Sequence, residues 1–488
     1  MANTVYSGRG FSDWEIGDVD VLFDGELFHL FHLIIPNHDY IAHAISKDGI
    51  NWERTKNAIH VGDPGEWDDD MLWTMHTTFC SETNLWRMFY TGLCLKEHGA
   101  VQRVGCAVSE DLYFWTKDES FEPIESTGPF YESVSDNPRG WLSFRDPFYF
   151  NDSDEEYLLV SARCSEGSIS RRGCTGLLKN IDGEWKHQSP LVSPGVYDDM
   201  ECPCVLKVNK RYYLIASIRE DRKVRYWYSK DLNGPYKTHA SNTLLPQGNF
   251  AGRILQRGDK ILVFSFFFVD QDPDGRRALP PPRELKVGEN NTLYVSSYSG
   301  WDTLRTAEIH LNHLELFCQF LDNKSASVRL DDETLYLKTD YENEFFTCSS
   351  FESNYIWEGE LSLKKPGKCG LILNLGEDGS GYFISLDVVN GFAQLRAWGV
   401  NEDDPREDYI FRTLQSNHFT IDPRMTYTFK LINYGSYIEF SLNDRVILSL
   451  VDYTYTSGEL GVYCSCTEVA LRDSSINLLR APSEDYLA

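Results

Sequence analysis

The sequence predicts an all-β protein, a five-bladed β-propeller followed by a C-terminal antiparallel β-sandwich. The propeller is predicted by one short phrase, a turn followed by a strand rich in aromatic and branched residues, which occurs five times. The five copies are residues 25–31, 84–90, 155–160, 210–215 and 259–264. Successive copies lie roughly 50 to 70 residues apart, close to the length of one propeller blade. The sandwich is predicted by long alternating strands after residue 317.

A second phrase follows the first in the early repeats. Residues 46–52 run from a Ser/Asp turn to Trp52, and residues 109–115 repeat this pattern and end at Trp115. Looser copies are found at 181–185 and 229–236. Such a turn suits the outer corner of a small antiparallel sheet, and four to eight such sheets arranged radially form a propeller. The repeat count therefore predicts five blades within residues 1–300.

The innermost strand of each blade should begin about 10 to 13 residues before each repeated strand. The positions found there are Asp18, Trp73-Thr74, Asp146, Glu201 and residues 250–252. Because equivalent positions of a radial repeat converge on the axis, we expect three blades to present a carboxylate at one height beside one cavity. Acids that face one another in a partly enclosed site have pKa values driven apart, as acid/base catalysis requires. The pattern predicts a carboxylate active site on the propeller axis.

Two other interpretations of these acids were weighed. The chain has 74 Asp and Glu residues, so a single acid is more often a solvated surface group than a catalyst. The shared register of three acids argues against that interpretation. A calcium site is disfavoured because the neighbours of Asp18, Asp146 and Glu201 lack the alternating oxygen ligands of a calcium loop. The sequence predicts no metal and no cofactor, since carboxylates and water suffice for this chemistry.

The short motifs around two of these acids resemble those of a known family. Phe144-Arg145-Asp146-Pro147 resembles the RDP motif, and Met200-Glu201-Cys202-Pro203 the ECP motif, of glycoside hydrolase family 32, the invertase, inulinase and levanase group. The chain is more distantly similar to family 43. Further similar strands are residues 42–48 with Trp52, 88–92, 102–103 and 107–112. The likeness covers about residues 10 to 300, and the two motifs in order and in register make it specific.

The resemblance implies a β-fructofuranosidase that acts by retaining double displacement on sucrose-like fructosides, fructo-oligosaccharides or fructans, with possible fructosyl transfer. It implies that Asp18 is the nucleophile and Glu201 the general acid/base. It also implies that Asp146 stabilises the transition state through sugar hydroxyls. Retention requires the two working carboxyl groups to lie about 5–5.5 Å apart, whereas inversion needs a wider gap.

The first-blade motif departs from the family pattern. The family's Asn-Asp-Pro-Asn-Gly run is replaced by Ile16-Gly17-Asp18-Val19-Asp20-Val21. Asp18 and Asp20 lie two residues apart, on one face of a strand, so either could point inward. The spacing to Asp24-Gly25 favours Asp18 as the nucleophile and leaves Asp20 as a substrate-binding residue.

The second blade also departs from the family, since Trp73-Thr74-Met75-His76 replaces its Phe-Ser-Gly word. Trp73 could stack on a sugar ring and His76 could donate to a hydroxyl, while core packing explains either equally well. Arg145 is expected to keep Asp146 ionised or to form a plain ion pair, and Cys202 to pack as a small buried residue. The predicted substrate-binding set is Arg145, Trp73, Thr74, Asp20, His76 and Cys202. Because these changes lie in the expected sugar subsite, sucrose need not be the preferred substrate.

Composition limits the partners. The formal net charge of −28 disfavours nucleic acid and anionic membranes and suits a neutral saccharide, small or oligomeric. No segment approaches the ~20 apolar residues that span a bilayer. The N-terminus shows no secretory signal, and twelve cysteines without such a signal predict reduced thiols in the cytoplasm. Secretion would follow if a leader preceded this sequence. The oligomeric state is left open.

After the propeller we expect a linker at 301–316 and a jelly-roll-like sandwich at 317–488, similar to the second domain of family 32 enzymes. Hydrophobic alternation between Gly, Asn and Asp turns indicates antiparallel strands there. The sandwich could be a carbohydrate-binding module or a buttress for the propeller. The sequence favours a buttress, because no cluster of surface aromatic residues stands out.

Two other functions stay open. An inverting pentosidase of the family 43 type, acting on arabinofuranosides or xylosides, is suggested by residues 18–21, which resemble that group's first strand, although the ECP word argues against it. A non-catalytic sugar-binding propeller would retain affinity without turnover. The full set of three acids argues against that function.

Overall fold

The structure is a computed structural model. It describes residues 5–8, 15–134, 139–269, 276–311, 317–351, 354–365, 367–387, 390–400, 409–419, 422 and 425–481. Within them the regular secondary structure is almost entirely β-strand, and the helices are short 3-10 turns. No helix within these ranges is long and apolar enough to cross a membrane. The chain divides into two compact units, Tyr6–Tyr294 and Val295–Ala488. The predicted fold class is confirmed.

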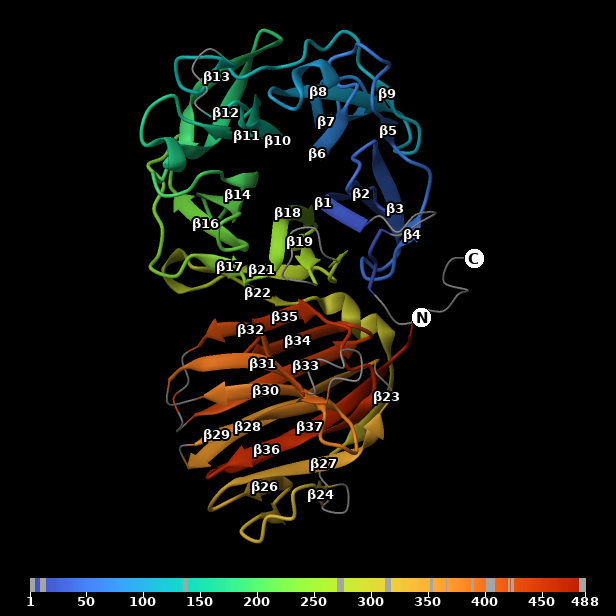
Figure 1. Ribbon diagram of the computed structural model, residues 1–488, viewed down its shortest axis with the longest axis vertical. Helices are drawn as coiled ribbons and strands as arrows, with labels where there is room; N and C mark the ends of the chain where they lie inside the picture. The colour runs from blue at the N-terminus through green and yellow to red at the C-terminus, as the bar shows by residue number, and fades with distance from the viewer. Residues whose placement is uncertain are drawn as a thin grey trace. The chain divides into compact units, whose positions relative to one another are not determined.

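The first unit is a ring of five small antiparallel sheets (Figure 1). Blade 1 holds β1 (Glu15–Phe23), β2 (Phe28–Ile35), β3 (Tyr40–Ser46) and β4 (Glu53–Arg54), with β5 (Ile59–His60) paired to β3. Blade 2 holds β6 (Met71–Cys80), β7 (Leu85–Leu93), β8 (Gln102–Ser109) and β9 (Thr116–Lys117), with η1 (Leu95–Glu97) between β7 and β8. Blade 3 holds β10 (Phe144–Asp152), β11 (Glu155–Arg163), β12 (Gly173–Ile181) and β13 (Glu184–Val192), with η3 (Ile169–Arg171) before β12.

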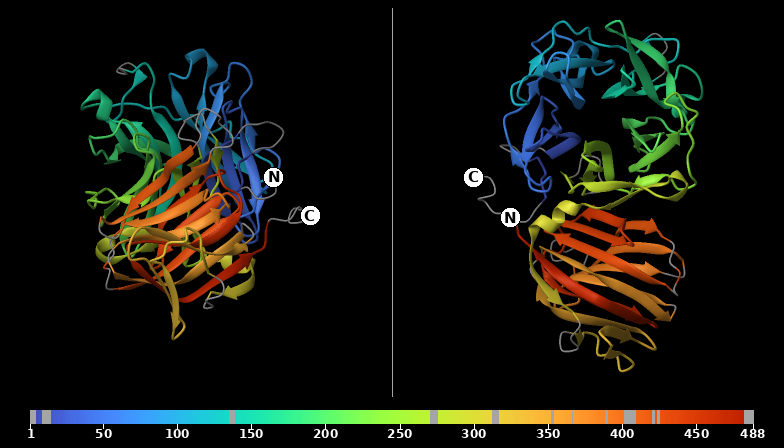
Figure 2. Two further views of the ribbon diagram at one scale, coloured as in Figure 1. Left: turned by 60° about the horizontal axis from the view of Figure 1, so that its bottom comes forward. Right: turned by 180° about the vertical axis from the view of Figure 1, so that it is seen from behind.

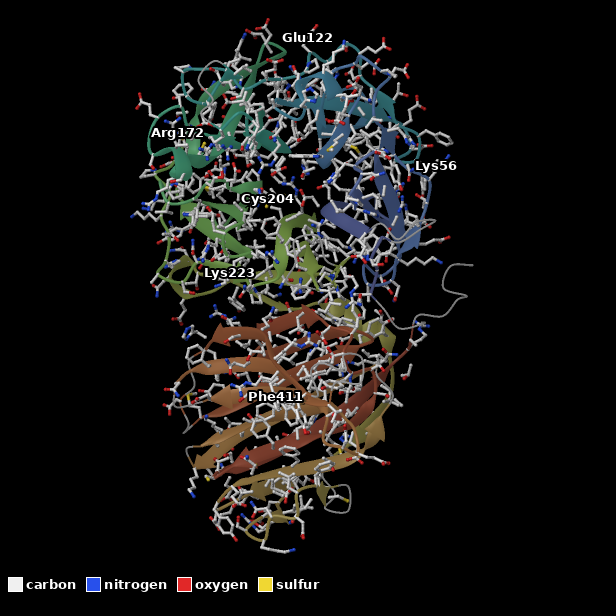
Figure 3. The ribbon with its side chains drawn as sticks, in the orientation of Figure 1. Lys56, Glu122, Arg172, Cys204, Lys223 and Phe411 are labelled. Atoms are coloured by element: carbon white, nitrogen blue, oxygen red, sulfur yellow. The ribbon has the colours of Figure 1, made fainter. Side chains whose placement is uncertain are left out.

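The remaining blades repeat this meander, and Figure 2 shows the ring from behind. Blade 4 holds β14 (Glu201–Val208), β15 (Arg211–Ile218), β16 (Lys223–Ser229) and β17 (Thr243–Leu245). Blade 5 holds β18 (Asn249–Arg257), β19 (Lys260–Phe268), β21 (Arg283–Val287) and β22 (Leu293–Ser297), with β20 (Arg277–Ala278) paired to β19 and η4 (Glu289–Asn291) before β22. Cys204 of β14 lies near the centre of the ring, whereas Lys56, Glu122 and Arg172 lie at its rim (Figure 3).

The five repeated aromatic phrases become the second strand of each blade, namely β2, β7, β11, β15 and β19. Each is hydrogen-bonded to the inner strand on one edge and to a third strand on the other. Most of its side chains are also buried, on both faces of the blade. The Ser/Asp phrase forms the expected turn. Asp48 accepts hydrogen bonds from the backbone N–H groups of Ile50 and Asn51, both at 2.8 Å, and Asp111 accepts from Phe114 at 2.8 Å.

Apolar side chains fill the wedges between neighbouring blades. Phe31 of blade 1 and Met88 of blade 2 belong to one buried cluster, and Phe89 of blade 2 and Phe144 of blade 3 belong to the next. The central residues of both clusters are fully buried. This packing fixes the inner strands relative to one another and therefore sets the geometry at the axis.

The second unit contains two antiparallel sheets. One runs β25-β26-β37-β28-β33-β34-β35, with β23 paired to β37, and the other runs β24-β27-β36-β29-β30-β31-β32. The bounds in the first sheet are β23 (Arg305–His310), β25 (Ser327–Asp331), β26 (Thr334–Lys338), β28 (Asn354–Lys365), β33 (Thr426–Tyr434), β34 (Tyr437–Leu442), β35 (Arg445–Val451) and β37 (Glu468–Leu479). Those in the second are β24 (Cys318–Gln319), β27 (Asn343–Phe351), β29 (Lys368–Leu375), β30 (Gly381–Asp387), β31 (Phe392–Val400), β32 (Tyr409–His418) and β36 (Gly458–Ser465).

The segment expected to be a linker, 301–316, is partly ordered into elements. The 3-10 helix η5 (Ser299–Leu304) buries Trp301, whose ring stacks with Tyr437 at a centroid distance of 6.2 Å. Strand β23 then adds to the edge of the first sheet through β37. Residues 312–316 lie outside the described part of the chain. Residues 301–310 are therefore part of the sandwich.

Candidate active site

The inner strand of every blade is interrupted by a β-bulge at the same place. Its register with the second strand shifts between Ile16 and Val19, Trp73 and Met75, Arg145 and Phe148, Glu201 and Cys204, and Phe250 and Arg253. A bulge leaves residues of one strand unpaired and turns their side chains away from the ladder. The repeated bulge creates five equivalent sites around the axis at which a side chain can leave the sheet.

The three predicted acids lie at these bulges, but they do not occupy equivalent positions. Glu201 is the last paired residue before its bulge, Asp146 is the first residue within the next, and Asp18 is the second within its own. We expected the three acids at one equivalent position of the repeat. This expectation was wrong, because from Glu201 to Asp146 to Asp18 the position relative to the bulge shifts by one residue each time. The bulge brings them together nonetheless, since Asp146 and Cys202 adopt φ values of 59° and 49°.

Asp18 and Asp146 lie beside each other with Cys202. Oxygen atoms of the two carboxylates and the Cys202 sulfur all lie within 4.8 Å of one another. The backbone N–H of Cys202 donates to Asp146 Oδ2 at 2.9 Å, and the N–H of Asp146 donates to Thr91 Oγ1 at 3.1 Å. The hydroxyl of Thr74 donates to Asp18 Oδ2. Blades 1 to 4 therefore all contribute to one cluster.

The two clustered carboxylates repel each other. The pKa of Asp18 is raised above its ordinary value, first by burial and then by the negative charge of Asp146. The Thr74 hydroxyl and the positive charge of Arg253 act in the opposite direction and favour the ionised form. A nearby cation or a developing positive charge would therefore favour the ionised form of Asp18 further.

Glu201 is paired with an arginine but stays a weak acid. Arg145 donates from Nη2 to Glu201 Oε1 at 2.6 Å. Burial nevertheless raises the pKa of Glu201 to about 7, because the charges of Asp146, Asp199 and Asp18 add to the cost of burial and the charge of Arg145 only partly offsets it. Near neutral pH this carboxyl can both give and take a proton.

Asp199 is a buried acid beside Arg145 that sequence reasoning missed. Its side chain is buried with 1% exposed, and neither carboxylate oxygen accepts a hydrogen bond from any described residue. Its Oδ2 lies 3.6 Å from Nη2 of Arg145 and 3.6 Å from Nη1 of Arg139. A buried carboxylate between two guanidinium groups raises the pKa of Arg145 and adds negative charge beside Glu201. Its place two residues before Glu201 was the only signal in the sequence.

Arg253 was also missed. It comes from the bulge of blade 5, is buried, and donates to the backbone oxygens of Met75 at 3.4 Å, Pro147 at 3.2 Å and Pro203 at 2.8 Å. These carbonyls belong to blades 2, 3 and 4. Arg253 therefore joins four blades at the axis and supplies the positive charge beside Asp18.

The other predicted residues surround this cluster with different contacts. Asp20 is buried and accepts from the backbone N–H of Thr77 at 2.6 Å and contacts His76 Nδ1 at 3.0 Å, so it anchors blade 1 to blade 2. The His76 ring also stacks on Phe148 at 4.3 Å. Trp73 is half-buried and packs against the cluster between blades 1 and 2. The structure brings Asp18, rather than Asp20, beside Asp146.

The cluster offers three atoms that could bind a metal, one each from Asp18, Asp146 and Cys202. Burial raises the pKa of the Cys202 thiol well above its ordinary value, so the sulfur stays a neutral, weak ligand. Arg145 Nε lies 3.7 Å from Asp146 Oδ2, and Arg253 adds a second positive charge. These residues suit a neutral, hydroxyl-rich ligand better than a cation.

Comparisons with known proteins show which proteins this chain is similar to. Residues 20–256 match the family model described as glycosyl hydrolases family 32 N-terminal domain. A levanase from Bacillus sp. (strain L7) is 26% identical over 284 residues, which cover 53% of this chain and 28% of that protein. The chain thus spans little more than a quarter of the levanase.

Solved structures resemble the whole chain. Fructan 1-exohydrolase IIa from Cichorium intybus has a TM-score of 0.70 at 16% identity and covers 99% of this chain and 98% of its own. Exo-inulinase from Aspergillus awamori has a TM-score of 0.71 at 13% identity and covers 99% of both chains. A Bombyx mori β-fructofuranosidase has a TM-score of 0.66 at 16% identity and covers 96% of this chain and 92% of its own. At these identities the likeness establishes the propeller and sandwich fold.

Proposed function

We propose, on the premise that residues 20–256 match the N-terminal domain of glycoside hydrolase family 32, that this protein is a retaining β-fructofuranosidase. The observation that carries the proposal is the convergence of Asp18, Asp146 and Glu201 from three blades, with the pKa of Glu201 raised to about 7. Glycoside cleavage requires two carboxylic groups, one able to donate a proton near neutral pH and one able to attack the sugar carbon as a carboxylate. Thr74 and Arg253 offset part of the cost of ionising Asp18 for the second role.

In this mechanism Glu201 first acts as the general acid. Its proton moves to the glycosidic oxygen as the bond to the fructosyl carbon breaks. The Asp18 carboxylate attacks that carbon and forms a covalent fructosyl ester. The positive charge that develops on the sugar favours the ionised form of Asp18, as the Thr74 hydroxyl and Arg253 already do.

In the second step the same groups work in reverse. Glu201, now a carboxylate beside Arg145, takes a proton from water, and the resulting hydroxide attacks the ester and releases fructose and Asp18. A sugar hydroxyl in place of water gives fructosyl transfer. Asp146, whose Oδ2 is held by the Cys202 N–H, is placed to accept hydrogen bonds from fructosyl hydroxyls.

We infer that the substrate is a neutral fructoside, with fructans and fructo-oligosaccharides preferred. The names of the levanase, the fructan exohydrolase and the exo-inulinase support this choice of substrate class. The net charge of −28 and the acids at the axis also disfavour anionic sugars. Trp73, Thr74 and His76, which replace the family's second-blade word, are proposed to set the preference among fructosides.

The test is Glu201→Gln, with Glu110→Gln on the surface as the control of equal charge change. Turnover of sucrose, short inulin and levan should fall by about 10²–10⁴-fold, the usual contribution of general acid/base catalysis, while the control keeps its activity. Proton NMR of the first product should show fructose with retained anomeric configuration. Unchanged turnover of every fructoside by Glu201→Gln would refute the proposal. Release of arabinose alone from an aryl arabinofuranoside would favour a pentosidase.

A further inference from the structure

A continuous row of aromatic rings crosses one face of the seven-stranded sheet of the sandwich. The successive ring centroids are 5.9 Å apart for Phe320–Phe345, 5.3 Å for Phe345–Phe383, 5.6 Å for Phe383–Trp398, 6.3 Å for Trp398–Phe411 and 5.9 Å for Phe411–Tyr409. Alternate residues of the same strands, such as Ile384 and Leu395, are fully buried in the core. Because side chains alternate between the faces of a sheet, the aromatic row lies on the outer face.

The rings on β31 and β32 are too exposed to serve core packing alone, whereas Phe320 and Phe345 pack against a buried cluster that includes Phe383. Phe411, labelled in Figure 3, is 70% exposed, Tyr409 is 62% exposed and Trp398 is 39% exposed. Phe383, at the middle of the row, is almost fully buried and forms the floor. A contiguous apolar patch of this kind on a soluble protein indicates a binding surface.

A cavity of about 290 Å³ lies at the middle of the row. Its walls include Phe345, Phe383, Trp398 and Tyr463. The Tyr463 ring crosses the strand beside it because Gly370 has no side chain, since a Cβ there would lie 2.7 Å from the ring. An apolar cavity with a few convergent polar groups is the usual form of a small-ligand site.

The polar groups of the cavity are held in fixed positions. Gln394 Oε1 accepts from Arg396 Nε at 3.1 Å and from Nη2 at 2.5 Å, which orients the guanidinium group 5.7 Å from the Trp398 ring centroid. The Tyr463 hydroxyl donates to Ser385 Oγ at 2.7 Å on the other side. Amide, guanidinium and hydroxyl groups beside flat rings can hydrogen-bond sugar hydroxyls while the rings cover the C–H faces of the sugar.

We propose that this face of the sandwich is a second saccharide site, which binds a neutral fructan chain. The choice of fructan rests on the proposed function, whereas the class of ligand follows from the rings and the polar groups. The row extends from β24 to β32, so it suits a polymer rather than one sugar ring. The net charge of −28 disfavours anionic polymers.

The proposal changes the role expected for the sandwich. The sequence favoured a buttress because no surface aromatic cluster stood out, and that reason does not hold in the structure. Five of the six rings come from four strands, β27, β30, β31 and β32, and Phe320 follows β24 directly. The sheet order brings Phe320 and Phe345, which are distant in sequence from β30, beside Phe383.

The test uses Trp398→Ala and Phe411→Ala in the Glu201→Gln background, so that binding is measured without hydrolysis. The control is Phe114→Ala, which removes an aromatic ring of similar exposure, 67%, from the propeller. Dissociation constants for levan and inulin should rise about tenfold, the effect of losing one aromatic anchor. With Glu201 intact, sucrose turnover by both variants should stay unchanged while turnover of the polymers falls.

The outcomes distinguish a failure of the proposed second site from a failure of the proposed hydrolytic activity. Affinity for both polymers unchanged in Trp398→Ala and Phe411→Ala, with fructosides still hydrolysed, overturns the second site and leaves the activity standing. Loss of polymer affinity in both variants, in a protein that turns over no fructoside, leaves the second site standing and overturns the activity. If light scattering shows that the variants lose only self-association, the face is an interface between copies and the proposal fails. Phe411→Ala guards against misfolding, because its ring is exposed.

Discussion

At the scale of single residues, Glu201 is the group whose protonation should govern the pH dependence. Its pKa of about 7 predicts that kcat/KM falls as the pH rises through 7, because the acid form is lost. The same shift affects stability. Since burial raises this pKa above its ordinary 4.5, ionisation destabilises the folded state, so this contribution is fully present below pH 4.5 and is lost as the pH rises to 7.

Asp199→Asn tests the cause of that pKa. Removing the negative charge beside Glu201 should lower its pKa and move the basic limb of the kcat/KM profile to lower pH, by a fraction of a unit to one unit. Asp231→Asn, an exposed acid of blade 4, is the control with the same change in net charge. An unshifted limb in Asp199→Asn would show that Asp199 only fixes Arg139 and Arg145, whereas an equal shift in both variants would assign the effect to net charge.

The residues that sequence reasoning found and missed differ in how local their signals are. Asp146 and Glu201 each lie within a short motif, so their roles can be predicted from neighbouring letters. Arg253 contacts the carbonyl of Met75, 178 residues away in the chain, and no local pattern encodes that contact. The repeat predicted where the acids cluster, but their one-residue offsets depend on the bulges.

At the scale of elements, the bulge of β1 depends on Gly17. A Cβ at this position would lie 2.9 Å from Leu33 Cβ and 3.0 Å from Ile35 Cδ1, so the two strands can approach only because the side chain is absent. The bulge in turn presents Asp18 to the axis.

Gly17→Ala should therefore cost about 1–3 kcal/mol of unfolding free energy through overpacking, and it should also displace Asp18 and lower kcat. Chemical denaturation and kinetics with one fructoside measure the two effects. Gly128→Ala is the control, because nothing lies within 4 Å of a Cβ there. Unchanged stability and activity in Gly17→Ala would mean that β1 adjusts and that the bulge does not need glycine.

The strands themselves were largely predictable, and their neighbours were not. The aromatic phrase predicted the second strand of each blade because burial on both faces demands a short, strongly apolar run. In the sandwich, buried Ile384 lies between Phe383 and Ser385, and buried Ala397 follows Arg396 and precedes Trp398, which indicates strands with one outer face. Sequence alternation does not reveal that β27, β36, β29 and β30 are successive neighbours, so the aromatic row could not be seen.

At the scale of the whole propeller, Arg253 of blade 5 links blades 2, 3 and 4 at the axis of the ring. Its contacts with three carbonyls satisfy buried backbone oxygens that lie beyond the reach of water. Radial repeats are otherwise held by packing between adjacent blades, so a residue that joins four blades stabilises the closed form in particular.

Arg253→Met keeps most of the volume but removes these donors. We expect a loss of several kcal/mol, since each buried carbonyl left unpaired costs about 1–3 kcal/mol, and we expect a lower Tm in calorimetry. Arg257→Met at the outer end of the same strand is the control, because its guanidinium lies over Phe23 and is not at the axis. An equal change in Tm for both variants would argue against a closing role for Arg253.

The bulge that recurs in every inner strand has a consequence for the adaptability of this fold. A bulge recurs in all five inner strands, yet only the bulges of blades 1 and 3 contain an acid, and Glu201 lies directly before the bulge of blade 4. The bulges of blades 2 and 5 contain Thr74 and Ala251. Because the main chain forms the bulge, the side chain at such a position can be exchanged without a change in the rest of the blade. Ala251 has a φ of 53°, close to the 59° of Asp146. The bulge of blade 5 is therefore a position at which a substitution can add another functional group to the axis of the propeller.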